Sequence, residues 1–228
     1  MLAAGKGIAK MGLSEEEDSL LCAVIAHESI LCDKAYREFL YTEFRLAHGG
    51  NDVKEILLAH GAFQAFVHHL YELCIALTQR ELKNIKQIKY EVADRHISVM
   101  VEKIWNVERR KSGSSLSGMT EAEFRDGYND FSKHFRRARN NSAHALIGRA
   151  RGGQSLDEFY SKYWVMLKLL FEYSTKWWRA IDVEGVNWHD IGKFNIRQIA
   201  LQSVHEHLLS LGKQGLPVPS NKKESPAG

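Results

Sequence analysis

The chain has 228 residues, of which 44% are hydrophobic and 26% are charged, and its formal net charge is +3. This composition excludes wholesale disorder and allows a sizeable core, while the mild positive charge neither requires nor repels a nucleic-acid partner. All three prolines lie at or after Pro217, so long helices can run uninterrupted through the rest of the chain.

The compartment is predicted from cysteine usage and apolar segments. The three cysteines are odd in number and show no CxxC spacing, which favours a reducing, cytoplasmic location. Residues 1–12 lack the long apolar core of a secretion signal. The most apolar stretch, Tyr163–Tyr173, contains a lysine and is too short to span a bilayer, so no membrane association is expected.

The first predicted element is a long helix. Ser14 and Glu17 have the spacing of a capping box, in which each side chain accepts a hydrogen bond from the other residue's backbone N–H. Apolar residues follow at helical spacing as far as Phe44. The pair Gly49-Gly50 then ends the pattern, because glycine favours helix termination.

A second helix is expected to begin at Asn51 or Asp52, either of which can act as its N-cap. Apolar residues surround its axis over 66–77, which predicts a central, buried helix. A third helical stretch covers about 84–110. The sequence leaves open whether 78–84 separates these two helices or continues them.

Two further capping boxes mark later helices. Thr120–Glu123 opens a helix that leads toward residue 139, after the Ser/Gly-rich loop Lys111–Gly118. Ser155–Glu158 opens an aromatic-rich helix that extends over Phe159–Ile181. A last amphipathic helix is expected at about 195–211.

These elements predict an all-α bundle of about six helices. We expect one domain over residues 13–214, with a flexible stretch at 1–12 and a disordered tail at 215–228. The candidate functional motif is expected within the part of the domain that covers about 120–175.

Chemistry-bearing side chains concentrate in Arg139–His144, which reads Arg-Asn-Asn-Ser-Ala-His. A cation, two amides and an imidazole can together hold a phosphodiester and move a proton at neutral pH. Arg136, Asn140 and His144 share one helical face because they are four residues apart. Arg139 and His144 are five apart, so they converge only through the reach of arginine, a helix break or a groove shared with a partner.

Arginine, a polar residue and a histidine at this spacing, within an α-helical setting, resemble the signature of the HEPN superfamily (higher eukaryotes and prokaryotes nucleotide-binding). Many members of that superfamily are metal-independent ribonucleases of toxin–antitoxin, abortive-infection and CRISPR-associated systems. The resemblance implies that Arg139 and His144 are catalytic and that Asn140 orients them. It also implies a homodimer whose composite active site forms where the motif helices of two subunits face each other.

The expected substrate is therefore RNA, with no metal and no cofactor. The basic segment around the motif supplies candidate RNA contacts at Arg136, Arg137, Arg149 and Arg151. An antitoxin or another regulatory protein is a further expected partner. The alternative is a non-catalytic α-helical module that binds RNA or protein, in which Arg139 and His144 only hold helices together. Burial separates the two, since catalytic side chains would line an open groove.

Other histidines and aromatic residues carry weaker hypotheses. His189-Asp190 resembles a metal-dependent phosphohydrolase dyad, but we favour a helix cap there. His68 and His69 point to different faces, so they cannot chelate together. His68 lies in one row with His60 and Gln64, on which no acidic partner is expected, so these histidines are interpreted as core or interface residues. The interpretation of most aromatic residues after Phe159 is also core, although they could stack bases.

The run Arg109-Arg110-Lys111, just before the Ser/Gly-rich loop, has two interpretations. We favour a solvated helix C-terminus, where cations interact favourably with the helix dipole. A contact with the RNA backbone is the alternative.

Overall fold

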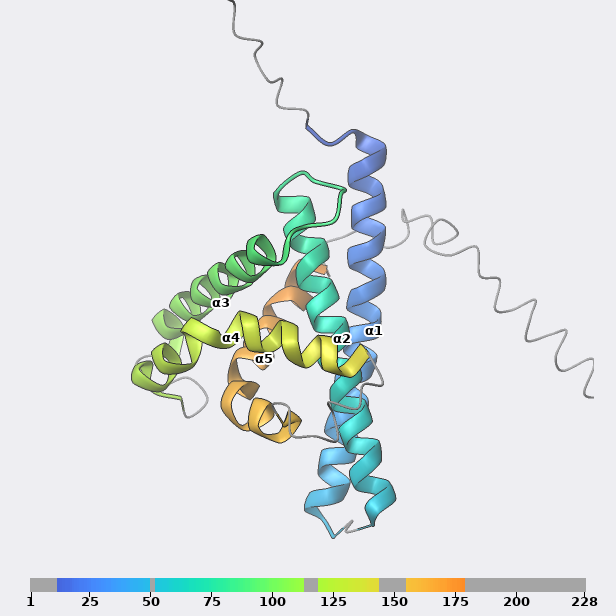
Figure 1. Ribbon diagram of the computed structural model, residues 1–228, viewed down its shortest axis with the longest axis vertical. Helices are drawn as coiled ribbons and strands as arrows, with labels where there is room; N and C mark the ends of the chain where they lie inside the picture. Colours follow the sequence, from blue (N-terminus) through green and yellow to red (C-terminus); the bar gives the residue numbers. More distant parts are fainter. Residues whose placement is uncertain (1–11, 50–51, 113–118, 144–154, 179–228) are drawn as a thin grey trace, which may run out of the picture. The chain divides into compact units, whose positions relative to one another are not determined.

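The computed structural model describes residues 12–49, 52–112, 119–143 and 155–178, and 88% of these residues are helical. Five helices follow one another along the chain (Figure 1): α1 (Glu15–Ala47), α2 (Val53–Glu81), α3 (Tyr90–Ser112), α4 (Glu121–Ala143) and α5 (Leu156–Trp178). The described residues contain no strand, so the predicted all-α class is confirmed. The helix predicted at 195–211 lies outside the described residues, which leaves five helices where about six were expected.

Local side-chain bonds fix where these helices begin. Ser14 Oγ accepts a hydrogen bond from the Glu17 N–H at 3.1 Å, and Glu17 Oε2 accepts one from the Ser14 N–H at 2.9 Å. Thr120 and Glu123 make the same reciprocal pair before α4. Asp52 is the N-cap of α2. The first backbone N–H groups of a helix lack intrahelical partners, and these bonds satisfy them.

A break separates α2 from α3 at residues 82–89, which settles the question that the sequence left open. Lys83 has a φ of +51°, in the left-handed region that cannot continue a right-handed helix. Asn84 then accepts a hydrogen bond from the Lys86 N–H through its side chain. The chain therefore reverses here instead of forming one long helix.

Helix α2 forms the centre of the core, as predicted. It packs along α1 and also contacts α3, α4 and α5. Phe66 is completely buried, and its ring lies 5.1–6.2 Å from those of Tyr36, Trp164 and Phe171. Aromatic rings at these separations add stabilisation to the area they bury. The core thus ties α5 to the α1–α2 pair.

The aromatic residues of α5 are mostly core residues, which confirms their interpretation where side chains are described. Tyr163 is buried between Phe131 and Phe159. Tyr160 donates a hydrogen bond from its hydroxyl to Glu43 of α1 at 2.6 Å. The side chains of Trp177 and Trp178 lie outside the described residues. No helix among the described residues has the length and apolar character needed to cross a membrane.

Candidate functional site at Arg139

Arg139 lies near the end of α4 and binds a carboxylate of α2. Its Nε donates to Glu72 Oε1 at 2.7 Å, and its Nη2 donates to the same oxygen. Its Nη1 donates to Asn140 Oδ1 at 3.0 Å. The arginine side chain is 27% exposed and that of Glu72 29%, so the pair lies at the edge of the core. These bonds hold the guanidinium in one orientation, at the end of a side chain that is partly exposed.

The guanidinium also lies close to an aromatic ring. Its central carbon is 5.8 Å from the ring centroid of Tyr71, which neighbours Glu72 on α2. Burial raises the pKa of Tyr71 to about 12. The phenol is therefore protonated at neutral pH and cannot serve as a base. Its ring supports the cation, because the face of an aromatic ring attracts positive charge.

Arg136, one turn before Arg139, binds a carboxylate of α3 instead. Three hydrogen bonds of 3.1–3.2 Å join its Nε and Nη2 to both oxygens of Asp94 on α3, a buried carboxylate. The guanidinium carbon lies 4.7 Å from the ring centroid of Tyr90. Hydrogen bonding to Asp94 raises the pKa of Arg136. Arg136 was a candidate RNA contact, but the structure gives it a partner that ties α3 to α4.

His68 belongs to the surroundings of Arg139, which the sequence analysis missed. It is half-buried on α2, one turn before Glu72, so both side chains lie on one helical face. Burial lowers the pKa of His68; the charges of His69 and Arg139 lower it further, while Glu72 opposes them. The expectation that this row lacks an acidic residue was wrong, because Glu72 is its next member. The His-x-x-x-Glu spacing was the available signal.

His69 faces the other way and binds α1. Its Nδ1 lies 3.0 Å from Glu28 Oε2, and the imidazole of His27 lies 3.4 Å from the other oxygen of Glu28. Burial raises the pKa of Glu28, but the two histidines outweigh it and the net shift is downward. The neighbours His68 and His69 therefore serve different contacts, as their opposite faces predicted.

The remaining predicted site residues are only partly within the described structure. Asn140 contacts Arg139 directly, and Arg137 is exposed on α4. His144, Arg149 and Arg151 lie outside the described residues, as does the pair His189-Asp190. In the described ranges no group of three or more histidine, cysteine or acidic side chains is placed to hold a metal ion.

Of the basic run at the end of α3, the side chains of Arg109 and Arg110 are described. Arg109 pairs with Glu121 in the first turn of α4. Arg110 is exposed. The ion pair shows that Arg109 links the ends of two helices, while an RNA contact stays a prediction.

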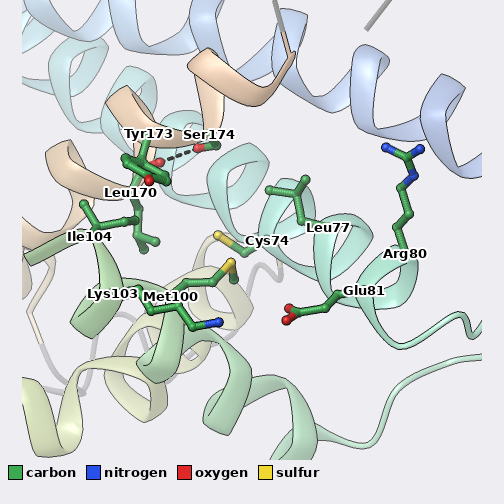
Figure 2. Close-up of a pocket in the computed structure, with 10 residues that line it drawn as sticks. All are labelled: Cys74, Leu77, Arg80, Glu81, Met100, Lys103, Ile104, Leu170, Tyr173 and Ser174. Carbon is green, nitrogen blue, oxygen red and sulfur yellow. Dashed lines mark hydrogen bonds between the residues drawn. The ribbon is translucent and has the colours of Figure 1, made fainter. Parts of the chain in front are cut away.

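A separate cavity of about 400 Å³ lies between α2, α3 and α5. Figure 2 shows its lining: Cys74, Leu77, Arg80, Glu81, Met100, Lys103, Ile104, Leu170, Tyr173 and Ser174. Burial raises the pKa of Cys74 to about 12, so its thiol stays protonated at neutral pH. Arg80 binds Asp18 of α1 at 2.8 and 3.0 Å. The cavity thus offers apolar contact but no activated nucleophile.

No family model, curated protein or solved structure matches the chain.

Proposed function

We propose that this protein is a HEPN-type endoribonuclease that cleaves RNA without a metal ion, in a toxin–antitoxin or antiviral defence role. Arg139 would bind the scissile phosphate, and His144 would transfer the proton. The observation that supports this assignment is the oriented, partly exposed guanidinium of Arg139, five residues before a histidine in the sequence.

The chemistry needs few groups. The 2′-hydroxyl of RNA is the nucleophile, and an imidazole with a pKa near 6.5 can take its proton or protonate the leaving oxygen. A guanidinium stabilises the charge that develops on the phosphate oxygens in the transition state. Two subunits that face each other would supply two histidines, one as base and one as acid.

The contacts of Arg139 are compatible with phosphate binding. A guanidinium has five N–H donors. Glu72 receives two of them and Asn140 receives one, so two have no partner among the described residues and could bind a phosphate. Asn140 therefore has an orienting role in this proposal, while Arg137, Arg149 and Arg151 supply backbone contacts to RNA.

The test is cleavage of single-stranded RNA by the purified chain in excess EDTA. We expect His144→Ala to lower the rate by roughly 10²–10⁴, the usual contribution of a positioned acid or base. Arg139→Ala should lose a comparable factor through weaker transition-state stabilisation. Both variants should retain the wild-type circular dichroism spectrum. Intact RNA after incubation with the wild-type chain, or a fully active His144→Ala variant, would contradict the proposal.

The second candidate is a non-catalytic RNA- or protein-binding module, and the Arg139–Glu72 bond itself favours it. Glu72→Gln separates the two candidates, because glutamine keeps an acceptor oxygen but removes the charge. If Glu72 positions a catalytic arginine, Glu72→Gln should lower kcat by about tenfold while the stability changes little. If the pair is only structural, Glu72→Gln and Arg139→Ala should lower stability and leave any RNA binding unchanged.

A further inference from the structure

The loop between α2 and α3, residues 82–89 (Figure 1), carries three evenly spaced lysines. Lys83, Lys86 and Lys89 are all exposed, and none of their side chains makes an ion pair or a hydrogen bond within the described residues. The loop contains no acidic residue, and the nearest ones, Glu81 and Glu91, lie outside it at its two ends. A row of cations with no carboxylate among them attracts an anionic partner.

Other lysines show that this arrangement is not general. Lysines of α1, α4 and α5 pair with carboxylates on their own or a neighbouring helix: Lys34, Lys133, Lys162 and Lys168. Lys54 and Lys103 are also unpaired among the described residues, but each stands apart from the row. Lys54 begins α2, roughly 40 Å along the helix from the loop, and Lys103 lies roughly 20 Å along α3 from Lys89.

Hydrogen bonds hold the loop in one conformation. The N–H of Asn84 donates to the carbonyl oxygen of Gln79 at 2.9 Å, and the side chain of Asn84 accepts from the Lys86 N–H at 2.9 Å. Nε2 of Gln79 donates to the carbonyl oxygen of Lys86 at 3.2 Å. The backbone positions of the lysines are therefore set before a partner binds, which reduces the entropy lost on binding.

An exposed aromatic ring follows the last lysine of the row. Tyr90 begins α3 and is 57% exposed, and the guanidinium carbon of Arg136 lies 4.7 Å from its ring centroid. Exposed aromatic rings beside cations are the surfaces on which single-stranded nucleic acids stack their bases. Arg136 lies one turn before Arg139 on α4, so the ring stands between the lysine row and the candidate site.

We infer that the α2–α3 loop and Tyr90 bind the part of a single-stranded RNA that continues beyond the phosphate at Arg139. The lysines contact the RNA backbone, and Tyr90 stacks one base. The connection to Arg139 rests on the proposed function, whereas binding at the loop does not require cleavage. An anionic membrane also suits lysines beside the exposed Ile85, but anionic lipid headgroups have no aromatic ring that would stack on Tyr90.

Fluorescence anisotropy of the full-length chain with a labelled 2′-O-methyl oligouridine of about 12 nucleotides tests the inference. This probe has no free 2′-hydroxyl, so it reports binding without cleavage. Replacement of both Lys86 and Lys89 by Gln should weaken binding about tenfold or more and lower the slope of log K against log salt by about 1.4 between about 50 and 200 mM. The matched control replaces Lys54 and Lys103 by Gln, which removes the same charge elsewhere and should change affinity less than about threefold.

Tyr90→Leu separates stacking from charge. Leucine keeps an apolar side chain but has no aromatic face, so affinity should fall about tenfold while the salt slope stays that of the wild type. Asp94 still holds Arg136 through its hydrogen bonds in this variant. Circular dichroism and urea denaturation check that each variant is folded.

Three results would overturn the inference. The first is a wild-type chain that does not bind the probe, including one that sediments with phosphatidylserine vesicles, which would identify a membrane surface instead. The second is a Lys86 and Lys89 double variant that keeps the wild-type affinity and salt slope, even if the chain cleaves RNA as proposed. The third is a control variant that loses affinity equally, because binding would then depend only on total charge. Conversely, loop-dependent binding by a chain that leaves RNA intact would contradict the proposed function and support the inference.

Discussion

Two arginines of α4 bind carboxylates that differ in burial, and this difference separates a structural role from a possible ligand-binding role. Asp94 holds Arg136 through both carboxylate oxygens and is itself only 8% exposed, so this pair is a structural tie. Glu72 holds Arg139 through one oxygen at the edge of the core. The two arginine side chains are almost equally exposed, at 25% and 27%, so it is the burial of the partner carboxylate that distinguishes them.

Arg136→Ala should therefore act on stability. Removal of the guanidinium leaves the buried carboxylate of Asp94 without its partner, which should lower the free energy of unfolding by about 1–3 kcal/mol. Arg137→Ala, at the adjacent exposed position, should change it by less than about 0.5 kcal/mol. Urea denaturation of both variants measures the difference. Equal stabilities would show that the Asp94 contact contributes nothing.

His68 should make stability depend on pH. The unfolded imidazole has a pKa of about 6.5, and burial lowers the folded value. The unfolded state therefore binds more protons below pH 6.5, and the free energy of unfolding falls as the pH falls through this range. His68→Gln should lose less stability than the wild type between pH 7.5 and 5.5 in urea titrations. Parallel pH profiles would contradict this assignment.

At the scale of the elements, α2 determines the packing of the described helices. It runs along α1, and its buried aromatic residues contact α5, while Glu72 and Tyr71 contact α4. The candidate site lies where α4 crosses this helix. A change that displaces α2 should therefore also displace Glu72 and alter the geometry of the candidate site.

Phe66→Ala tests the central role of α2. Deletion of a completely buried ring leaves a cavity, and the free energy of unfolding should fall by about 3–5 kcal/mol. Ile30→Ala, at an exposed position of α1, should cost no more than about 0.5 kcal/mol. Thermal and chemical denaturation measure both changes. A small effect at Phe66 would mean that the core can collapse around the deletion.

For the whole molecule, the proposed composite active site makes a prediction about assembly. If each active site needs two subunits, activity per chain should rise with protein concentration and level off as dimers fill. Cleavage rates measured from nanomolar to micromolar protein test this. Constant activity per chain would show that one subunit suffices for catalysis. It would contradict the composite site but not the proposal that the protein cleaves RNA.

Helix starts and fold class could be predicted from the sequence because they depend on local interactions. Ser14 and Glu17, like Thr120 and Glu123, are three residues apart, so their reciprocal bonds form wherever the chain becomes helical. The apolar spacing of α2 likewise predicted its burial. The same spacing could not locate the α2–α3 break. The chain turns there at Lys83, which adopts a left-handed conformation, and no glycine or proline stands at this position to indicate the turn.

The partners of the candidate site were decided only by the tertiary structure. Arg139 and Glu72 are 67 residues apart, and their bond exists because α4 crosses α2 at this level. The sequence alone determined that a guanidinium stands near the end of a helix and five residues before a histidine. Packing of the helices decided which carboxylate orients it, which imidazole lies beside it and how much of it solvent can reach. Such contacts depend on the relative placement of whole helices, which no short spacing in the sequence encodes.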